Sequence, residues 1–272
     1  MAQYLLRCLN YLRNGWSVIG IPNNWVVCRS NENSSAVRLF CFPYAGGGLS
    51  VYRTWAEEAP SEIEVCCVQW PGSQNRIRET PFTCFDELVP ALVSAISRWL
   101  DRPFAFYGHS LGAKIAFETI RELRRQGRAE PSHLFVGASH APHVPWPHPG
   151  LHLLEEDAFI EGIQRRYGGV PQQVVDDPDL RSLLIPGLRA DVRLTETYRY
   201  TPEAPLNSPI AVFGGTSDRT VDPRALQAWQ HQTCKSFRLR MMDGDHFFLN
   251  AARQELLSAI ATEIQLNPIT VG

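Results

Sequence analysis

The sequence predicts one α/β domain with a mostly parallel central sheet flanked by helices. From Val37 onward, short apolar runs typical of buried strands alternate with longer runs of helical periodicity, and this alternation favours a parallel sheet. The pattern Gly108-His109-Ser110-Leu111-Gly112 lies where one strand-like run meets a helix-like run. A chain of 272 residues, 44% of them hydrophobic, can bury a full core, and α/β domains of this length are often single.

The elements are assigned in chain order from their apolar residues. Strand-like runs cover residues 37–42, 65–70, 103–107, 133–138, 210–213 and 237–241. The run 103–107 is continuously apolar, as buried parallel strands are. Helix-like runs cover residues 51–58, 85–100, 111–126 and 247–264. In the third helix-like run, Leu111, Ile115 and Leu123 belong to an apolar stripe at helical spacing. Gly127 follows it where a helix cap is expected.

Between residues 141 and 208 the alternation stops. Four prolines lead into two helical stretches that have no convincing strand between them, so we expect a helical lid inserted into the fold. Gly168 and Gly169 should end the first stretch, and Pro186-Gly187 should break or kink the second. We therefore expect an N-terminal extension of unknown role over residues 1–24, a single domain over 25–267 that includes this lid, and a C-terminal tail over 268–272.

Charge and hydropathy exclude several classes of partner. The formal net charge is −2 and the isoelectric point is near 6.4, so no global basic field attracts nucleic acid or an anionic membrane. No apolar run approaches the roughly 18 residues that a membrane-spanning helix needs. Small-molecule or protein partners are favoured.

The cysteines and histidines do not form a metal-binding pattern. The seven cysteines are an odd number and include no C-x-x-C pair, so we expect reduced, buried thiols and hence a cytoplasmic protein. Four histidines crowd the lid entry, but they lack the helical spacing and the nearby carboxylates of a metal site: His140, His143, His148 and His152. We expect neither a metal nor a cofactor.

The glycine-flanked Ser110 predicts a nucleophile. In a G-x-S-x-G elbow the glycines let the chain turn sharply from strand to helix, which exposes the serine hydroxyl. A serine becomes reactive only when a base takes its proton and a third group orients that base. His109 is expected to be a packing residue of the elbow.

The acid and the base are expected on loops that follow later strands, in the chain order of α/β-hydrolases. Asp218 comes directly after the strand-like run 210–213, and we favour it as the acid over Asp222, which is placed as a helix N-cap. His246 is the histidine that follows the last predicted strand and precedes the final helix. It is the expected base.

The oxyanion of a tetrahedral intermediate needs two backbone N–H donors. The residue after the nucleophile, Leu111, supplies one in an elbow. The second is expected from the glycine-rich loop 42–48, with Ala45 as the donor. A phosphate-binding role for this loop is not favoured, because no Gly-Lys-Ser/Thr follows it.

With these residues assigned, the chain resembles the type II thioesterases that accompany nonribosomal peptide and polyketide synthases. The resemblance runs from about Trp25 to Ile264. Its most specific parts lie in the expected lid, in the runs 166–171, 188–191 and 196–200. Two positions depart from the family pattern, Ser73 where an arginine is expected and the run 138–142, which lacks a basic residue before Ala-Pro.

The resemblance implies a stand-alone editing hydrolase that removes acyl or aminoacyl groups from the phosphopantetheine of carrier proteins. Ser110, His246 and Asp218 would form the triad, water would be the final acceptor, and the chain would need no cofactor of its own. Two alternatives remain open: an acyltransferase or cyclase with the same triad, and an inactive carrier-binding scaffold.

Two further groups of side chains each allow more than one interpretation. The basic group Arg121, Arg124, Arg125 and Arg128 would meet an acidic carrier or, as we favour, form a solvated face. A group of apolar side chains from the expected lid would line an acyl chamber, seat the lid on the core, or do both: Phe159, Ile163, Leu183, Leu184 and Leu188.

Overall fold

A computed structural model describes residues 25–28, 37–147, 150–168 and 170–266. The expected N-terminal extension (1–24) and C-terminal tail (268–272) lie outside these residues. Also outside them are Cys8, which was counted among the thiols, His148 from the expected lid entry, and Gly169.

The described residues form one seven-stranded sheet with the order β1-β3-β2-β4-β5-β6-β7. The strands are β1 Val26–Cys28, β2 Val37–Phe42, β3 Ile63–Val68, β4 Phe104–His109, β5 Leu134–Gly137, β6 Ile210–Gly215 and β7 Phe237–Met242. All neighbours pair in parallel except β1, which runs antiparallel to β3 at the edge. The mostly parallel sheet is therefore confirmed. Strand β1 was not predicted, because three residues are too few to give a period.

Two central strands extend beyond their apolar runs. In β4, Gly108 and His109 still pair with Phe42 and Gly137 on the neighbouring strands. In β6, Gly215 pairs with Met242. Backbone pairing between strands continues where side-chain hydrophobicity has ended, so the sheet's carboxyl edge lies farther along the chain than the apolar pattern indicates.

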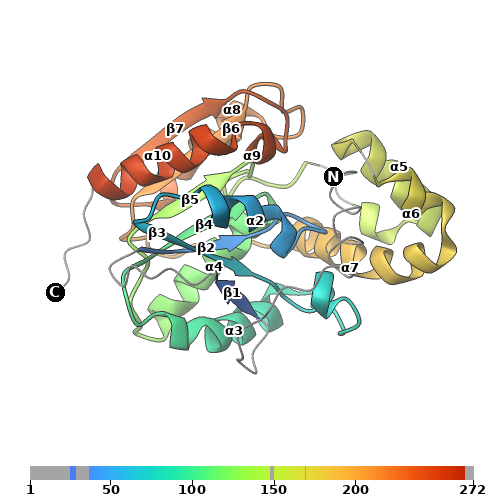
Figure 1. The fold of residues 1–272 in the computed structure, drawn as a ribbon, viewed down its shortest axis with the longest axis horizontal. Coiled ribbons are helices and arrows are strands. Elements are labelled where there is room, and N and C mark those ends of the chain that lie inside the picture. Colours follow the sequence, from blue (N-terminus) through green and yellow to red (C-terminus); the bar gives the residue numbers. More distant parts are fainter. Residues whose placement is uncertain (1–24, 29–36, 148–149, 169, 267–272) are drawn as a thin grey trace.

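Helices cover both faces of the sheet (Figure 1). They are α2 Leu49–Glu58, α3 Phe85–Ile96, α4 Leu111–Arg125, α8 Pro223–Gln227, α9 Phe248–Ala251 and α10 Arg253–Leu266. One buried cluster joins α3 and α4 to the face that carries Phe40 and Phe106. A second joins α2 and α10 to the face that carries Leu39 and Tyr107. Alternate residues of each strand thus supply two separate cores.

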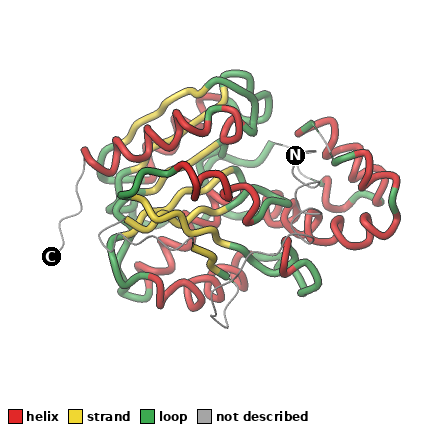
Figure 2. The backbone as a smooth tube through the Cα atoms, viewed as in Figure 1, coloured by secondary structure: helices red, strands yellow, loops and turns green. Residues whose placement is uncertain are grey.

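Between β5 and β6 the chain leaves the sheet and forms a helical insertion, which lies to one side of the sheet in Figures 1 and 2. Its helices are α5 Glu156–Tyr167, α6 Gln172–Asp176 and α7 Pro178–Thr197, preceded by a 3-10 turn over Leu151–Leu153. Gly168, at φ +74°, ends α5 as expected. The insertion has its own apolar core around Phe159 and Ile185.

The expected break at Pro186 is wrong, because α7 continues through it. Ile185 and Leu188 on either side are buried in the insertion's core, and this packing holds the helix together where a proline removes a backbone hydrogen bond. At Gly187 a Cβ atom would lie 2.2 Å from the carbonyl oxygen of Gly72, so glycine is needed there for close approach rather than for a helix end.

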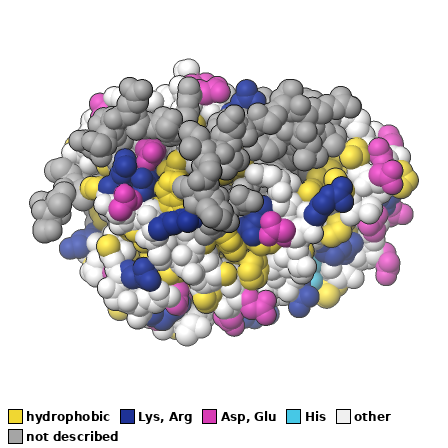
Figure 3. All heavy atoms as spheres, turned by 60° about the horizontal axis from the view of Figure 1, so that its bottom comes forward, with side chains coloured by type: hydrophobic (Ala, Val, Ile, Leu, Met, Phe, Trp, Pro, Cys, Tyr) yellow, Lys and Arg dark blue, Asp and Glu magenta, His cyan; other side chains and the backbone are white. Residues whose placement is uncertain are grey.

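Acidic and basic side chains are interspersed over the described residues visible in Figure 3, and neither kind gathers into a patch of one sign. This agrees with the small net charge. Within the described part of the chain, the structure contains no helix whose length and apolar character would let it span a bilayer.

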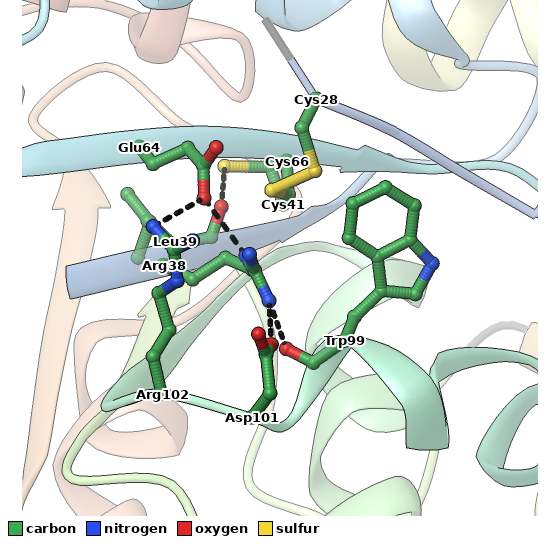
Figure 4. The surroundings of a disulfide bond; sticks show 9 residues. All are labelled: Cys28, Arg38, Leu39, Cys41, Glu64, Cys66, Trp99, Asp101 and Arg102. Atoms are coloured by element: carbon green, nitrogen blue, oxygen red, sulfur yellow. Dashed lines mark hydrogen bonds and ion pairs between the residues drawn. A yellow bond between two sulfur atoms is a disulfide. The ribbon is translucent and has the colours of Figure 1, made fainter. Parts of the chain in front are cut away.

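The expectation that the cysteines are reduced thiols is wrong for two of them. Cys28 and Cys66 form a disulfide bond (Figure 4). They face each other on the antiparallel strands β1 and β3, with 4.1 Å between their Cα atoms. Because β1 was not predicted, neither was this pairing. Cys41, Cys67, Cys84 and Cys234 are free, so the expected thiols are found at four of the six cysteines that the structure describes.

Candidate active site

The chain makes the expected sharp turn at Ser110, between β4 and α4. Ser110 has φ +54°, which is rare for a residue with a side chain. A Cβ atom on Gly108 would lie 2.4 Å from the carbonyl oxygen of Gly112, and one on Gly112 would lie 2.2 Å from that of Phe42. Both glycines are therefore required by close backbone approach, and the turn presents the serine side chain at the carboxyl edge of the sheet.

Three side chains that are far apart in the sequence meet at this edge. Ser110 Oγ lies 3.1 Å from Nε2 of His246, and Nδ1 of the same ring lies 2.9 Å from Oδ2 of Asp218. The side chains of His246 and Asp218 are 7% and 2% exposed. Burial opposes ionisation of Asp218, but the hydrogen bond and charge of His246 outweigh it and lower the pKa of the carboxyl. The structure thus brings all three predicted residues together.

Asp222, the competing acid, lies elsewhere. Its Oδ1 accepts a hydrogen bond of 2.6 Å from the backbone N–H of Arg224 and caps the N-terminus of α8. This is the N-cap position expected from the sequence.

Thr220 belongs to the same hydrogen-bonded group and was missed by sequence reasoning. Its N–H and its hydroxyl each lie 2.7 Å from Oδ1 of Asp218, and its Oγ1 lies 2.9 Å from Nδ1 of His246. These contacts fix the carboxylate in the orientation that faces the imidazole. The signal was present, because a threonine two residues after a loop aspartate is typical of a turn closed by the aspartate side chain.

His109 is more than a packing residue. It is fully buried, its Nε2 lies 2.7 Å from the carbonyl oxygen of His246, and its Nδ1 lies 3.0 Å from the hydroxyl of Tyr107. Because a carbonyl only accepts, Nε2 carries the proton and Nδ1 accepts from Tyr107. Burial lowers the pKa of His109 to about 3, so the ring is neutral. It supports the loop that carries His246.

Ala45 and Leu111, the expected oxyanion donors, lie on the loop after β2 and at the start of α4, which pack together. The close approach of Gly112 to Phe42 brings the start of α4 against the loop after β2. Leu111 is the first residue of α4, so its N–H has no acceptor within the helix. Ala45 lies in a turn closed by a 2.7 Å hydrogen bond from Gly47 N–H to Tyr44 O, and it lines the same pocket as Ser110.

That pocket, of about 440 Å³ including its open mouth, is lined by Ser110 and His246. The insertion supplies apolar walls from Ile163, Leu188 and Val192, and Tyr167 packs its ring against that of His246 with centroids 5.3 Å apart. Of the apolar group proposed to line a chamber, Ile163 and Leu188 do so. Phe159 and Leu184 pack in the insertion's core, and Leu183 is half-buried outside both.

The arginine group at the end of α4 is solvated only in part: Arg125 and Arg128 are exposed, whereas Arg121 is buried. The Arg121 side chain is 2% exposed and pairs with Glu118 at 2.8 Å and with Glu203 at 2.7 Å. Arg124 and Arg125 also pair with Glu203, at 3.0 and 2.7 Å. Glu203 follows α7, so these ion pairs join the end of the insertion to α4. Three of the four arginines therefore form ion pairs with acidic side chains.

One of the histidines at the lid entry, His152, pairs with a carboxylate of the insertion. His152 Nδ1 lies 2.5 Å from Oε2 of Glu196, and that carboxylate also accepts from the backbone N–H groups of Leu151 and His152. Within the ranges that the structure describes, no three histidine, cysteine or acidic side chains are grouped so that they would hold a metal ion.

Comparison with known proteins identifies the chain. The thioesterase domain family matches residues 37–264. The gramicidin S biosynthesis protein GrsT of Aneurinibacillus migulanus is 41% identical over 245 residues, which are 90% of this chain and 95% of that protein. Thioesterase PikA5 of Streptomyces venezuelae is 35% identical over 232 residues, which are 85% and 82% of the two chains.

A solved structure agrees. The type II thioesterase BorB from the borrelidin biosynthetic cluster superposes with a TM-score of 0.79 at 30% identity, covering 90% of this chain and 98% of that one. The expected α/β-hydrolase fold and the resemblance to type II thioesterases are thereby confirmed. The chain belongs to the thioesterase family.

Proposed function

We propose that this protein hydrolyses acyl or aminoacyl thioesters on the phosphopantetheine thiol of carrier proteins that serve a peptide or polyketide synthase. The observation that carries the proposal is the chain of contacts from Ser110 through His246 to Asp218, open to a pocket with apolar walls. Membership of the thioesterase family and the biosynthetic relatives support the substrate class.

In this mechanism Ser110 Oγ attacks the thioester carbonyl while Nε2 of His246 takes its proton. The carbonyl oxygen becomes an oxyanion that the backbone N–H groups of Ala45 and Leu111 bind. When the C–S bond breaks, His246 returns the proton to the leaving thiolate. Asp218 stabilises the imidazolium throughout and, with Thr220, keeps the proton of the resting ring on Nδ1.

The first half of the reaction leaves the acyl group as an ester on Ser110, and the second half repeats these steps with water. Water enters where the thiol has left and attacks the ester carbonyl while His246 removes its proton. The tetrahedral intermediate collapses to the free acid, and His246 returns the proton to Ser110 Oγ. The products are one carboxylic acid and one carrier thiol for each thioester and water consumed.

The test is hydrolysis of an acyl group loaded on a phosphopantetheinyl carrier domain, with both the free thiol and the acyl product measured. Ser110→Ala should lower the rate by at least about 10⁴-fold. Ser97→Ala is the matched control, because Ser97 Oγ donates only to Val93 O at the end of α3, and it should keep the wild-type rate.

Three outcomes would contradict the proposal. A wild-type rate no faster than that of Ser110→Ala excludes hydrolysis by this site. A transferred or cyclic acyl product in place of the free acid indicates an acyltransferase. Failure of a fluorophosphonate probe to label Ser110 indicates a carrier-binding scaffold without catalytic activity.

A further inference from the structure

Helix α7 buries an acidic side chain beside the turn that contains Ala45. Asp191 is 4% exposed, and its two carboxylate oxygens accept hydrogen bonds from different parts of the chain. Oδ2 lies 2.8 Å from the backbone nitrogen of Gly46, and Oδ1 lies 2.9 Å from Nε1 of Trp70. The acid therefore joins the insertion to the loop after β2 and to the loop after β3.

Both donors are neutral, so a buried charge is held by hydrogen bonds alone. Burial raises the pKa of Asp191 to about 6, although the hydrogen bonds from Gly46 and Trp70 act in the opposite direction. A buried carboxylate without a cationic partner is costly to keep in a fold. Packing alone would be served as well by an apolar side chain, so the contacts of the carboxylate need a further explanation.

The contact with Gly46 selects one conformation of a turn. Residues Tyr44 to Gly47 are closed by the hydrogen bond between their ends, and Gly46 has φ +72°, as the third residue of a type II turn does. In the related type I turn this φ is negative and the central peptide is turned over. The N–H of Gly46 would then point away from Asp191. The carboxylate thus holds the peptide that directly follows Ala45.

The same stretch of α7 forms a wall of the pocket. A Cβ atom on Gly46 would lie 2.9 Å from Cδ1 of Leu188, so the helix rests directly on the turn. Leu188 and Val192, which flank Asp191 in the helix, both line the pocket that contains Ser110. One short segment therefore lines the pocket and also contacts the turn that contains Ala45.

We propose that Asp191 is a positioning residue, which holds the turn at Ala45 and Gly46 in the conformation that binds the oxyanion and ties this turn to the pocket wall on α7. The inference rests on the proposed function, in which the Ala45 N–H is an oxyanion donor. Asp191 touches neither substrate nor Ser110, so it acts through Gly46.

The test compares Asp191→Asn with Trp70→Phe. Asparagine keeps the shape of the side chain but cannot accept from both donors. Phenylalanine removes only the Trp70 contact and leaves the one with Gly46. For each variant, kcat and KM are measured on an acyl-pantetheine thioester. The dissociation constant is measured for an alkylboronic acid, which forms a tetrahedral adduct with the serine. Circular dichroism confirms folding.

Asp191→Asn should lower kcat by about 10- to 100-fold, below the loss seen when an oxyanion donor is removed outright. It should change KM less than threefold and weaken the boronic acid by a factor similar to the loss in kcat. Trp70→Phe should keep kcat within about threefold. If Asp191→Asn does not fold, Asp191→Ser is measured instead, because serine removes the carboxylate and its shorter side chain places no NH₂ group against the donors.

The inference is overturned if kcat is unchanged, if the loss falls on KM alone, if boronic acid affinity is unchanged, or if Trp70→Phe loses as much kcat as the Asp191 variant. Failure of the proposed function looks different. In that case the wild-type protein binds the boronic acid at Ser110 but hydrolyses no carrier-bound thioester, while the effect of Asp191 on boronic acid affinity persists.

Discussion

The carboxyl edge of the sheet and the helical insertion line the same pocket, but different interactions hold them in place. At the sheet edge, Ser110, Asp218 and His246 follow strands β4, β6 and β7, whose register is fixed by continuous backbone pairing. The insertion instead has a separate apolar core, and ion pairs such as that between Arg124 and Glu203 fasten its end.

This difference separates two tasks. Hydrogen-bonded strands place the three side chains of the proposed triad with little freedom, which the proposed proton transfer over about 3 Å requires. Packed helices tolerate substitutions of similar size, so the insertion can change the shape of the pocket while the reacting groups stay where they are. We expect substitutions at the edge to change the rate of the chemical step and substitutions in the insertion to change which acyl group is accepted.

The larger effect is expected at the sheet edge, where His109 supports the loop that carries His246. The pKa of His109 is about 3 when folded, below its ordinary value near 6.5, so the unfolded chain binds a proton that the folded protein does not. The stability that this neutral ring contributes is present above pH 6.5. It is lost as the pH falls toward 3, by about 3 kcal/mol between pH 7 and pH 4.

Replacing His109 isolates that contribution. His109→Gln keeps a donor for the His246 carbonyl but does not titrate. Urea unfolding at several pH values should therefore show that the free energy of unfolding falls less steeply with acidification in the variant than in the wild type. Carboxylates titrate in both proteins and cancel in the difference. Parallel curves for the two proteins would show that His109 does not carry the effect.

The smaller effect concerns the insertion. Ile163 and Ile160 lie on α5 and are 1% and 3% exposed, but only Ile163 lines the pocket. Ile163→Val removes one methyl group from the pocket wall and should raise the ratio of kcat/KM for a longer acyl chain over a shorter one by about fivefold, since a methylene contact is worth about 1 kcal/mol or more.

Ile160→Val is the matched control for this change. Both substitutions should cost about 1 kcal/mol of stability, as measured by urea unfolding. Only Ile163→Val should change the ratio. An equal change in both variants would mean that selectivity follows the stability of the insertion rather than the shape of the pocket.

The contrast between the sheet edge and the insertion also explains which site residues could be predicted from the sequence. Ser110, Asp218 and His246 could be placed because each follows a strand that its own apolar residues indicate, and parallel strands end at one edge. Asp191 could not, since its contact with Gly46 joins segments that no local pattern relates. For Thr220 the spacing to Asp218 indicates only the turn, and its contact with His246 depends on the tertiary structure.

Tertiary contacts also overrode local patterns in the fold. Burial of Ile185 and Leu188 keeps α7 continuous through Pro186. The disulfide between Cys28 and Cys66 depends on the antiparallel pairing of β1, a strand too short to predict. Features that depend on several strands ending at one edge of the sheet can be predicted from the sequence. Features that depend on a single tertiary contact cannot.

The central claim is that Asp218, on the loop after β6, is the acid that orients His246 and stabilises its positive charge during hydrolysis. The most direct test is kcat for thioester hydrolysis by Asp218→Asn and Asp222→Asn, two isosteric changes four residues apart. We predict that Asp218→Asn loses about 10⁴-fold, because the neutral amide cannot stabilise the imidazolium of His246. Asp222→Asn, which still caps α8, should stay within threefold. An equal loss in both variants, or an Asp218→Asn rate within tenfold of the wild type, would contradict the claim.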